Sequence, residues 1–168
     1  MKKFFLLLLI IPFAASAQKS AIDYNDMIVE EQTKIGQKII DFNYAVESDA
    51  DMEMPLKLTL AQIDASIAAI ENLSTWEDGA ALKSSALQLF KFYKSIVSVE
   101  YREMVNILYH ENLSDADVNR LNELMASVSE REKKYDDDFQ RVQEAFAKRW
   151  NIDLVPNEIQ GEIDGLDE

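Results

Sequence analysis

Residues 114–150, SDADVNRLNELMASVSEREKKYDDDFQRVQEAFAKRW, decide the fold class. Apolar residues recur along this stretch every three or four positions, with a single step of seven between Val128 and Tyr135. The repeating positions are Val118, Leu121, Met125, Val128, Tyr135, Phe139, Val142 and Phe146. Such spacing predicts one long helix that packs along its length against other helices. Ser114 followed by Asp117 predicts a cap at its start, so we expect the helix to run from Asp115 to Trp150.

Three more segments have helical periodicity, at about 20–46, 55–73 and 80–111. The segments between them are short and polar, and Pro55 suits the first turn of a helix. Four amphipathic helices joined by short loops predict an all-α fold, an antiparallel up-down-up-down four-helix bundle over residues 18–150. The alternative is a set of long coiled coils that close only on dimerisation.

The first 17 residues have the pattern of a secretory signal peptide. Lys2 and Lys3 precede the apolar run 4–13, and Ala15-Ser16-Ala17 is a small-x-small cleavage site. The apolar run is shorter than the roughly 20 residues that span a membrane. We therefore expect cleavage after Ala17, no stable membrane insertion afterwards, and an exported protein that is periplasmic, held at the cell surface or secreted.

Charge and composition narrow the classes of partner. Loss of the two lysines with the signal peptide leaves 15 basic and 31 acidic side chains, a formal charge of −16. Such a chain repels nucleic acid and anionic membranes, so its charge favours basic proteins, cations or neutral surfaces as partners, or serves solubility alone. Together with export, this predicts another protein of the cell envelope as the partner. The oligomeric state stays open. The chain has no Cys, so in an oxidising compartment its stability must come from the packed core.

Few residues are suited to catalysis or cofactor binding. The chain has no Cys and a single His, His110, which excludes a thiol nucleophile and the pair of Glu-x-x-His motifs of a di-iron bundle. Asp49-x-Asp51-x-Glu53 begins like a calcium loop, but its sixth position is Met54 and its twelfth is Leu60. We therefore predict that the protein is not an enzyme and has no resident metal or cofactor.

A set of polar residues interrupts the apolar seams. Glu132 fills the step between Val128 and Tyr135, and antiparallel packing would place Gln32 and Tyr93 at the same level. Gln32, Tyr93, Glu132 and Tyr135 are thus the candidate ligand-binding residues. Three interpretations remain: a buried polar layer that fixes the helix register, a site for a small ligand or cation, or simple exposure to solvent.

Residues 151–168 form an acidic tail with no basic residue. Ile152, Leu154, Val155, Ile159, Ile163 and Leu166 are spread among its acids. We expect an irregular or disordered segment. It either orders on a partner, folds back across its own bundle or stays loose.

The segment Asp23-Tyr-Asn-Asp-Met-Ile-Val-Glu-Glu-Gln32, followed by long amphipathic helices, resembles a group of bacterial exported or surface proteins without assigned function. These proteins are predicted to be small helical bundles. The resemblance implies a secreted or surface-located helical protein and carries no site residue with it. We therefore expect a cell-envelope interaction module; the alternative is a carrier of a small ligand or metal ion with its site in the bundle core.

Overall fold

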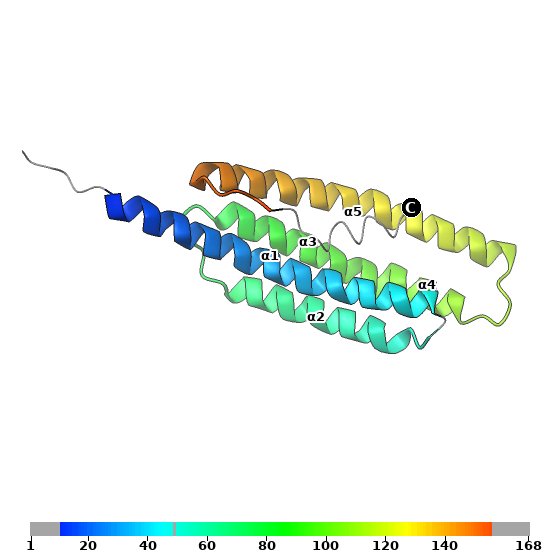
Figure 1. Ribbon diagram of the computed structural model, residues 1–168. Helices are drawn as coiled ribbons and strands as arrows, with labels where there is room; N and C mark the ends of the chain where they lie inside the picture. Colours follow the sequence, from blue (N-terminus) through cyan, green and yellow to red (C-terminus); the bar gives the residue numbers. More distant parts are fainter. Residues whose placement is uncertain (1–10, 49, 156–168) are drawn as a thin grey trace, which may run out of the picture.

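The structure is a computed structural model that describes residues 11–48 and 50–155, with side chains described from Ser20 onward. Within this part the chain is helical and contains no strand, which confirms the all-α fold class. The elements are α1 (Ile11–Glu47), α2 (Glu53–Asn72), α3 (Ala80–Ile96), the π-helical η1 (Val97–Tyr101), α4 (Arg102–Leu108) and α5 (Asp115–Trp150). Because α3, η1 and α4 follow one another without a break, these residues form four long helical segments packed side by side (Figure 1).

The helix from Asp115 to Trp150 has the predicted bounds, and its predicted cap is confirmed. The backbone N–H of Asp117 donates to Ser114 Oγ at 3.2 Å, and the backbone N–H of Ser114 donates to Asp117 Oδ2 at 2.9 Å. The two residues thereby satisfy backbone donors that a helix start would otherwise leave unpaired.

The other bounds differ from the predictions at their ends. α1 is already helical at Ile11, the first described residue, so helical structure extends at least nine residues before the predicted start at about position 20. The third helix ends at Leu108 and contains the π turn η1, whose extra residue leaves no signature in the apolar periodicity.

Three of the four lateral helix pairings are extensive: α1 with α2, α2 with α3, and α3 with α5. They enclose a core of fully buried side chains, of which Phe90, Ile35 and Ile63 are among the largest. The fourth pairing, between α1 and α5, is slight. The bundle is therefore open along one side.

An aromatic cluster joins the ends of three segments near this opening. Its members are Tyr24, Trp76, Phe146 and Trp150, and the rings of Trp76 and Trp150 meet edge to face with centroids 4.4 Å apart. The Tyr24 hydroxyl donates to the carbonyl of Gly79 at 3.2 Å, and Trp150 Nε1 donates to Asp78 Oδ1 at 3.0 Å. The cluster thus holds the first half of α1, at Tyr24, and the end of α5 against the turn before α3.

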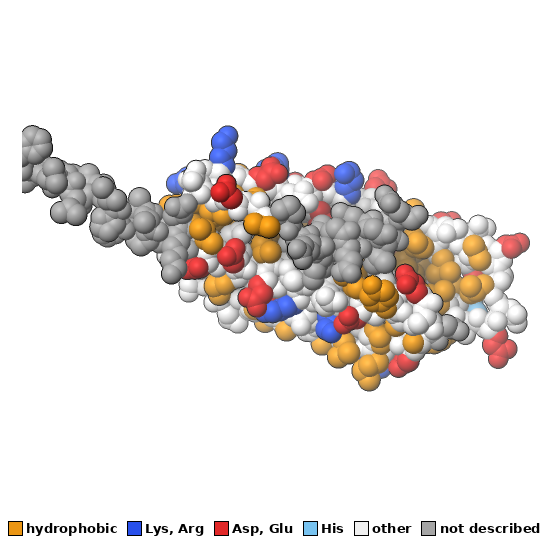
Figure 2. Space-filling view, viewed as in Figure 1, with side chains coloured by type: hydrophobic (Ala, Val, Ile, Leu, Met, Phe, Trp, Pro, Cys, Tyr) orange, Lys and Arg blue, Asp and Glu red, His pale blue; other side chains and the backbone are white. Residues whose placement is uncertain are grey.

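The predicted seam of α5 is wrong at two positions. Val118 is 45% exposed and Met125 is 58% exposed, whereas Leu124 and Val128 are buried in this part of the helix. Val128, Phe139 and Phe146 of the predicted seam are buried, so the prediction fails only toward the start of the helix. On the face seen in Figure 2, exposed hydrophobic side chains occur among acidic groups.

Among the described residues, no helix combines the length and the apolar character that crossing a membrane requires.

Candidate binding groove between α1 and α5

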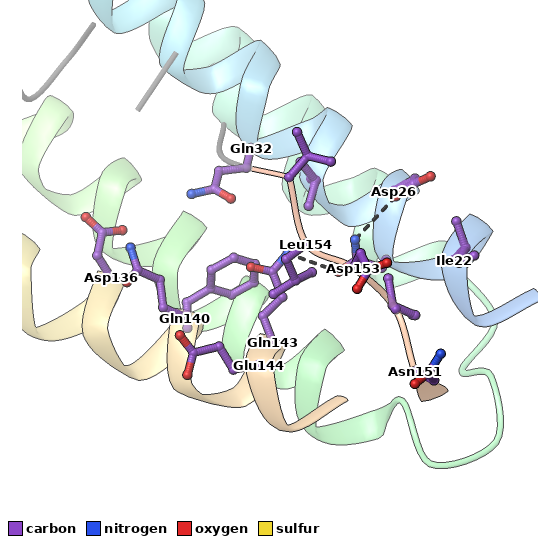
Figure 3. A pocket seen from close by; sticks show the side chains of 15 residues that line it. Ile22, Asp26, Gln32, Asp136, Gln140, Gln143, Glu144, Asn151, Asp153 and Leu154 are labelled. Carbon is purple, nitrogen blue, oxygen red and sulfur yellow. Dashed lines mark hydrogen bonds between the residues drawn. The ribbon is translucent and has the colours of Figure 1, made fainter. Parts of the chain in front are cut away.

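The open side of the bundle contains a groove of about 700 Å³. Its walls come from α1 and α5, and one end is formed by residues 151–155, which turn back after α5 (Figures 1 and 3). Asn151 adopts a left-handed conformation with φ 53°, and the N–H of Ile152 donates to the carbonyl of Ala147 at 2.8 Å. This helix-ending turn directs the following residues into the groove.

The groove lining combines apolar, amide and acidic side chains. The apolar residues are Ile22, Val29, Phe139, Ile152, Leu154 and Val155. The amides are Asn25, Gln32, Gln140, Gln143 and Asn151. The acids are Asp26, Asp136, Glu144 and Asp153. No lysine or arginine is among the described residues of this lining, so the groove presents negative charge beside apolar surface.

A pair of amides bridges α1 and α5 within the groove. Gln143 Nε2 donates to Asn25 Oδ1 at 3.0 Å, and Asn25 Nδ2 donates to Asp26 Oδ1 at 3.3 Å (Figure 3). Asn25 is only 5% exposed, so its amide needs these partners. The Gln143–Asn25 hydrogen bond holds α1 and α5 together at this level of the groove.

Two of the four predicted site residues approach this groove. Gln32 is half-buried and lines it. Tyr93 is buried, and its hydroxyl donates to Asp136 Oδ1 at 3.1 Å. Since Asp136 lines the groove, Tyr93 supports the groove wall from behind.

The other two predicted residues lie elsewhere. Glu132 is half-buried and acts on Tyr93 through its charge, but it is not part of the groove lining. Tyr135 stacks on Phe92 with ring centroids 4.4 Å apart and lines a separate surface hollow between α3 and α5. The structure therefore does not bring the four predicted residues together in one site.

The pKa of Tyr93 is raised well above its usual value. Burial is the main cause, because it disfavours the charged phenolate, and the neighbouring carboxylates of Asp136 and Glu132 add to it. Tyr93 therefore stays protonated and remains a hydrogen-bond donor at neutral pH.

Sequence reasoning missed the carboxylate that meets Tyr93. Asp136 belongs to the run Asp136-Asp137-Asp138, whose members point in different directions around the helix, so the run as a whole gives no signal of a site. The position of Asp136 four residues after Glu132 was an available signal, since residues four apart share a face. Asp136, together with Asn25 and Gln143, forms the polar contacts of the open seam.

The π turn η1 places a further carboxylate against α5. Glu100 pairs with Arg131 through Oε1, while its Oε2 is buried and has no hydrogen-bond partner among the described residues. The Arg131 guanidinium also lies 5.3 Å from the centroid of the Phe92 ring. Arg131 thereby links η1 to the stacked pair Phe92 and Tyr135 on the face away from the groove.

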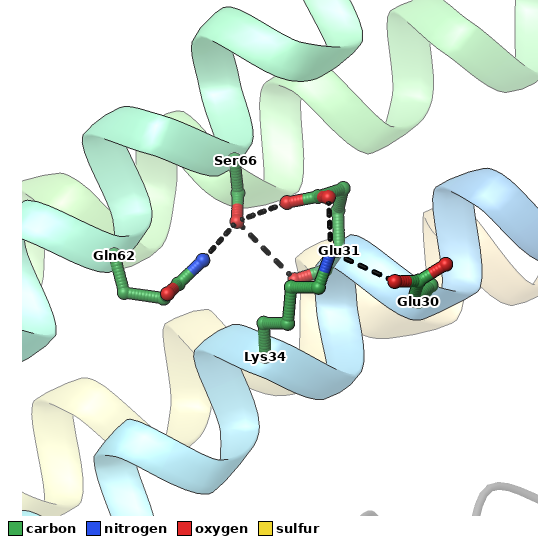
Figure 4. A network of polar contacts seen from close by, with 5 residues as sticks. All are labelled: Glu30, Glu31, Lys34, Gln62 and Ser66. Atoms are coloured by element: carbon green, nitrogen blue, oxygen red, sulfur yellow. Dashed lines mark hydrogen bonds and ion pairs between the residues drawn. The ribbon is translucent and has the colours of Figure 1, made fainter.

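Polar contacts between α1 and α2 lie outside the groove. Ser66 Oγ donates to Glu31 Oε2 at 2.7 Å, and Gln62 Nε2 donates to Ser66 Oγ at 3.0 Å (Figure 4). Lys34 pairs with Glu30 and Glu31, and the hydrogen bond to Glu31 is the main cause that raises the pKa of Lys34 to about 12. These contacts tie two packed helices together.

Within residues 11–48 and 50–155, His, Asp and Glu side chains form no group of three that could hold a metal ion. Comparisons with protein-family models, with curated proteins and with solved structures find no match to this chain.

Proposed function

We propose that this protein is an exported helical-bundle binding module of the cell envelope that holds its partner in the groove between α1 and α5. The observation that carries the proposal is the slight α1–α5 pairing, which leaves a lined groove where a closed bundle would have a fourth packed interface. Concave, partly apolar surfaces with a few polar groups are typical binding sites.

We also propose that neighbouring helices of this module run in opposite directions, up and down in turn. Side-chain pairs support this direction because the residue numbers rise on one helix as they fall on the other. Glu31 meets Ser66 and Lys38 meets Thr59; in the same manner Tyr93 meets Asp136 and Glu103 meets Arg120. The five residues of loop 48–52 reach roughly 18 Å at most, too short to return along α2, whose 20 residues extend about 30 Å.

Spin labels can test this arrangement. Labels at the exposed positions Gln37 and Leu58 should lie about 6 Å closer than labels at Gln37 and Ala69. The contacts of Lys38 with Thr59 and of Glu31 with Ser66 place Gln37 level with about residue 60, roughly 3 Å from Leu58 and roughly 13 Å from Ala69 along the helix axis, and packed helices lie about 10 Å apart. Double electron–electron resonance measures both distances. Equal distances, or the reverse order, would contradict antiparallel packing of α1 and α2.

Export is supported by the sequence of residues 1–17 alone. Cleavage after Ala17 would make Gln18 the first residue and leave α1 running from there to Glu47. Intact-mass measurement of protein recovered from the cell envelope and from the cytoplasm tests this part. Full-length protein in the envelope fraction would contradict cleavage at this site.

Photo-crosslinking in the native envelope tests the binding function. A benzophenone amino acid at Val29 in the groove, and another at Leu154, should crosslink the partner. The matched control is the same group at Leu58 on α2, which is 49% exposed and does not line the groove. Crosslinks from the groove positions that do not exceed those from Leu58 would argue against binding there.

A small-molecule carrier is the second candidate, because the groove volume of about 700 Å³ falls in the range of small-ligand sites. Native mass spectrometry of protein purified from its own envelope separates the two candidates. A retained small mass supports the carrier, and a protein adduct supports the interaction module.

A further inference from the structure

The groove walls have the spacing of a helix interface. On α1 the lining residues Ile22, Asn25, Val29 and Gln32 step by three and four positions, and on α5 Asp136, Phe139 and Gln143 do the same. Residues at these steps form one stripe along each helix. Two stripes that run side by side along a groove fit an elongated ligand such as an α-helix better than they fit a compact small molecule.

The α5 stripe continues past the groove. Steps of seven lead from Phe139 through Glu132 and Met125 to Val118, so the two exposed apolar residues lie on the groove side of α5. Apolar side chains that a closed bundle would bury are here available to an occupant. On the α1 side, Ile22 to Gln32 covers about 15 Å, the length of roughly three helical turns.

The acidic lining of the groove favours a positively charged ligand. Asp26, Glu144 and Asp153 are exposed at the groove, on the α1 wall, on the α5 wall and at the end formed by residues 151–155 respectively. The lining contains no basic residue among those described, and the whole chain carries a formal charge of −14. An acidic helix, including a helix from a second copy of this chain, would be repelled, whereas lysine or arginine side chains would be attracted.

We propose that the groove binds an amphipathic helix of a basic partner protein. Its apolar face rests on Ile22, Val29 and Leu154, and its lysine or arginine side chains reach Asp26, Glu144 and Asp153. The bound helix takes the place of the missing fourth interface, a helix-in-groove mode of recognition. This inference rests on the proposed function and adds the chemical class of the partner.

The test uses a fluorescein-labelled peptide of about 14 leucine and lysine residues in helical period, titrated with the full chain and followed by anisotropy. The peptide should bind, and it should bind more weakly at higher salt because exposed charges are screened. The triple variant Asp26→Asn, Glu144→Gln, Asp153→Asn should bind it about tenfold more weakly. The control triple Glu47→Gln, Glu111→Gln, Glu130→Gln removes the same charge from exposed positions outside the groove and should bind within about threefold of the parent.

Several outcomes would overturn the inference. Equal weakening by the two triple variants would show attraction by net charge alone. Equal binding of a scrambled peptide of the same composition would exclude recognition of a helix, and equal binding of a peptide with glutamate in place of lysine would exclude charge selection. Tight binding of spermine that displaces the peptide would assign the groove to a small amine. A dimer in native mass spectrometry that Met125→Lys dissociates would assign it to a second copy.

Failure of this inference can be distinguished from failure of the proposed function. A neutral or anionic ligand crosslinked to Val29 or Leu154 would overturn the basic helix and leave the groove as the binding site. Absence of any crosslink specific to these positions would overturn both.

Discussion

Replacing Tyr93 with Phe tests the polar contact behind the groove wall. The change removes the hydroxyl that donates to Asp136 Oδ1 at 3.1 Å and leaves the buried ring in place. A hydrogen bond to a charged group contributes roughly 1.5–3 kcal/mol, and the low end applies because Asp136 borders an open groove that water can enter. We expect a loss of about 1.5 kcal/mol in the free energy of unfolding near neutral pH, or a Tm lower by about 3–6 °C for a chain of this size.

The loss should depend on pH. The pKa of Tyr93 is raised in the folded state, mainly by burial, whereas an unfolded phenol has a pKa of about 10. The Tyr93 hydroxyl therefore makes its full contribution to the free energy of unfolding below about pH 10. Above that pH the contribution falls, because the phenol of the unfolded chain loses its proton at a lower pH than the buried phenol of the folded chain. This group alone lowers parental stability by about 1.4 kcal/mol per pH unit in that range. The stability difference between the parent and Tyr93→Phe should thus close near about pH 11.

Urea unfolding at several pH values between about 8 and 11 measures this difference directly. Tyr44→Phe is the matched control: Tyr44 is 54% exposed, and its replacement should change stability by less than about 0.5 kcal/mol. Burial also raises the pKa of Tyr24, but Tyr24 is present in both proteins and cancels from the comparison. A parent and variant of equal stability at neutral pH, or a difference that stays constant up to pH 11, would refute the assigned role of Tyr93.

Three further changes test other parts of the structure. Ser114→Ala removes the cap of α5 and should cost about 1 kcal/mol in urea unfolding, while Ser127→Ala, at an exposed position within the same helix, should not; equal effects would argue against the cap. Gly79→Ala would place a Cβ 2.5 Å from Tyr24 Cε1 and 2.9 Å from the carbonyl oxygen of Trp76. We therefore expect the free energy of unfolding to fall by about 1–3 kcal/mol and the tryptophan fluorescence spectrum to change. An unperturbed Tm would contradict this packing. Met125→Gln should leave the Tm within about 2 °C of the parent because Met125 is 58% exposed. A fall of about 2 kcal/mol or more in the free energy of unfolding, as is typical of core methionines, would show that Met125 is buried between α1 and α5.

The sequence was sufficient to predict the four helical segments because their signals are local. The start of α5 follows from Ser114 and Asp117, and its length follows from apolar residues that repeat over about eight turns. Both signals depend on residues within one turn of each other, so neither requires knowledge of the tertiary packing.

The site was predicted less well because it depends on which helix pairs are close. Periodicity alone placed Val118 and Met125 in the core, but the α1–α5 pairing that would cover them is slight. The step at Glu132 identified the right region of α5, yet the carboxylate that receives the Tyr93 hydrogen bond is Asp136, one helical turn further on. The π turn shifts the phase of the third helix, and this shift could not be read from the apolar spacing.

The order of the helices along the chain has a mechanical consequence for the open side. α1 and α5 are the first and last elements of the described residues, so none of the loops 48–52, 73–79 and 109–114 connects them directly. Their separation can therefore change without stretching a loop; the Asn25–Gln143 hydrogen bond is the contact that such a change would break at the level of the groove. The aromatic cluster of Tyr24, Trp76, Phe146 and Trp150 lies directly beside this hydrogen bond and limits the change at that level, so the part of the two helices beyond Gln32 and Asp136 has the fewest contacts to hold it.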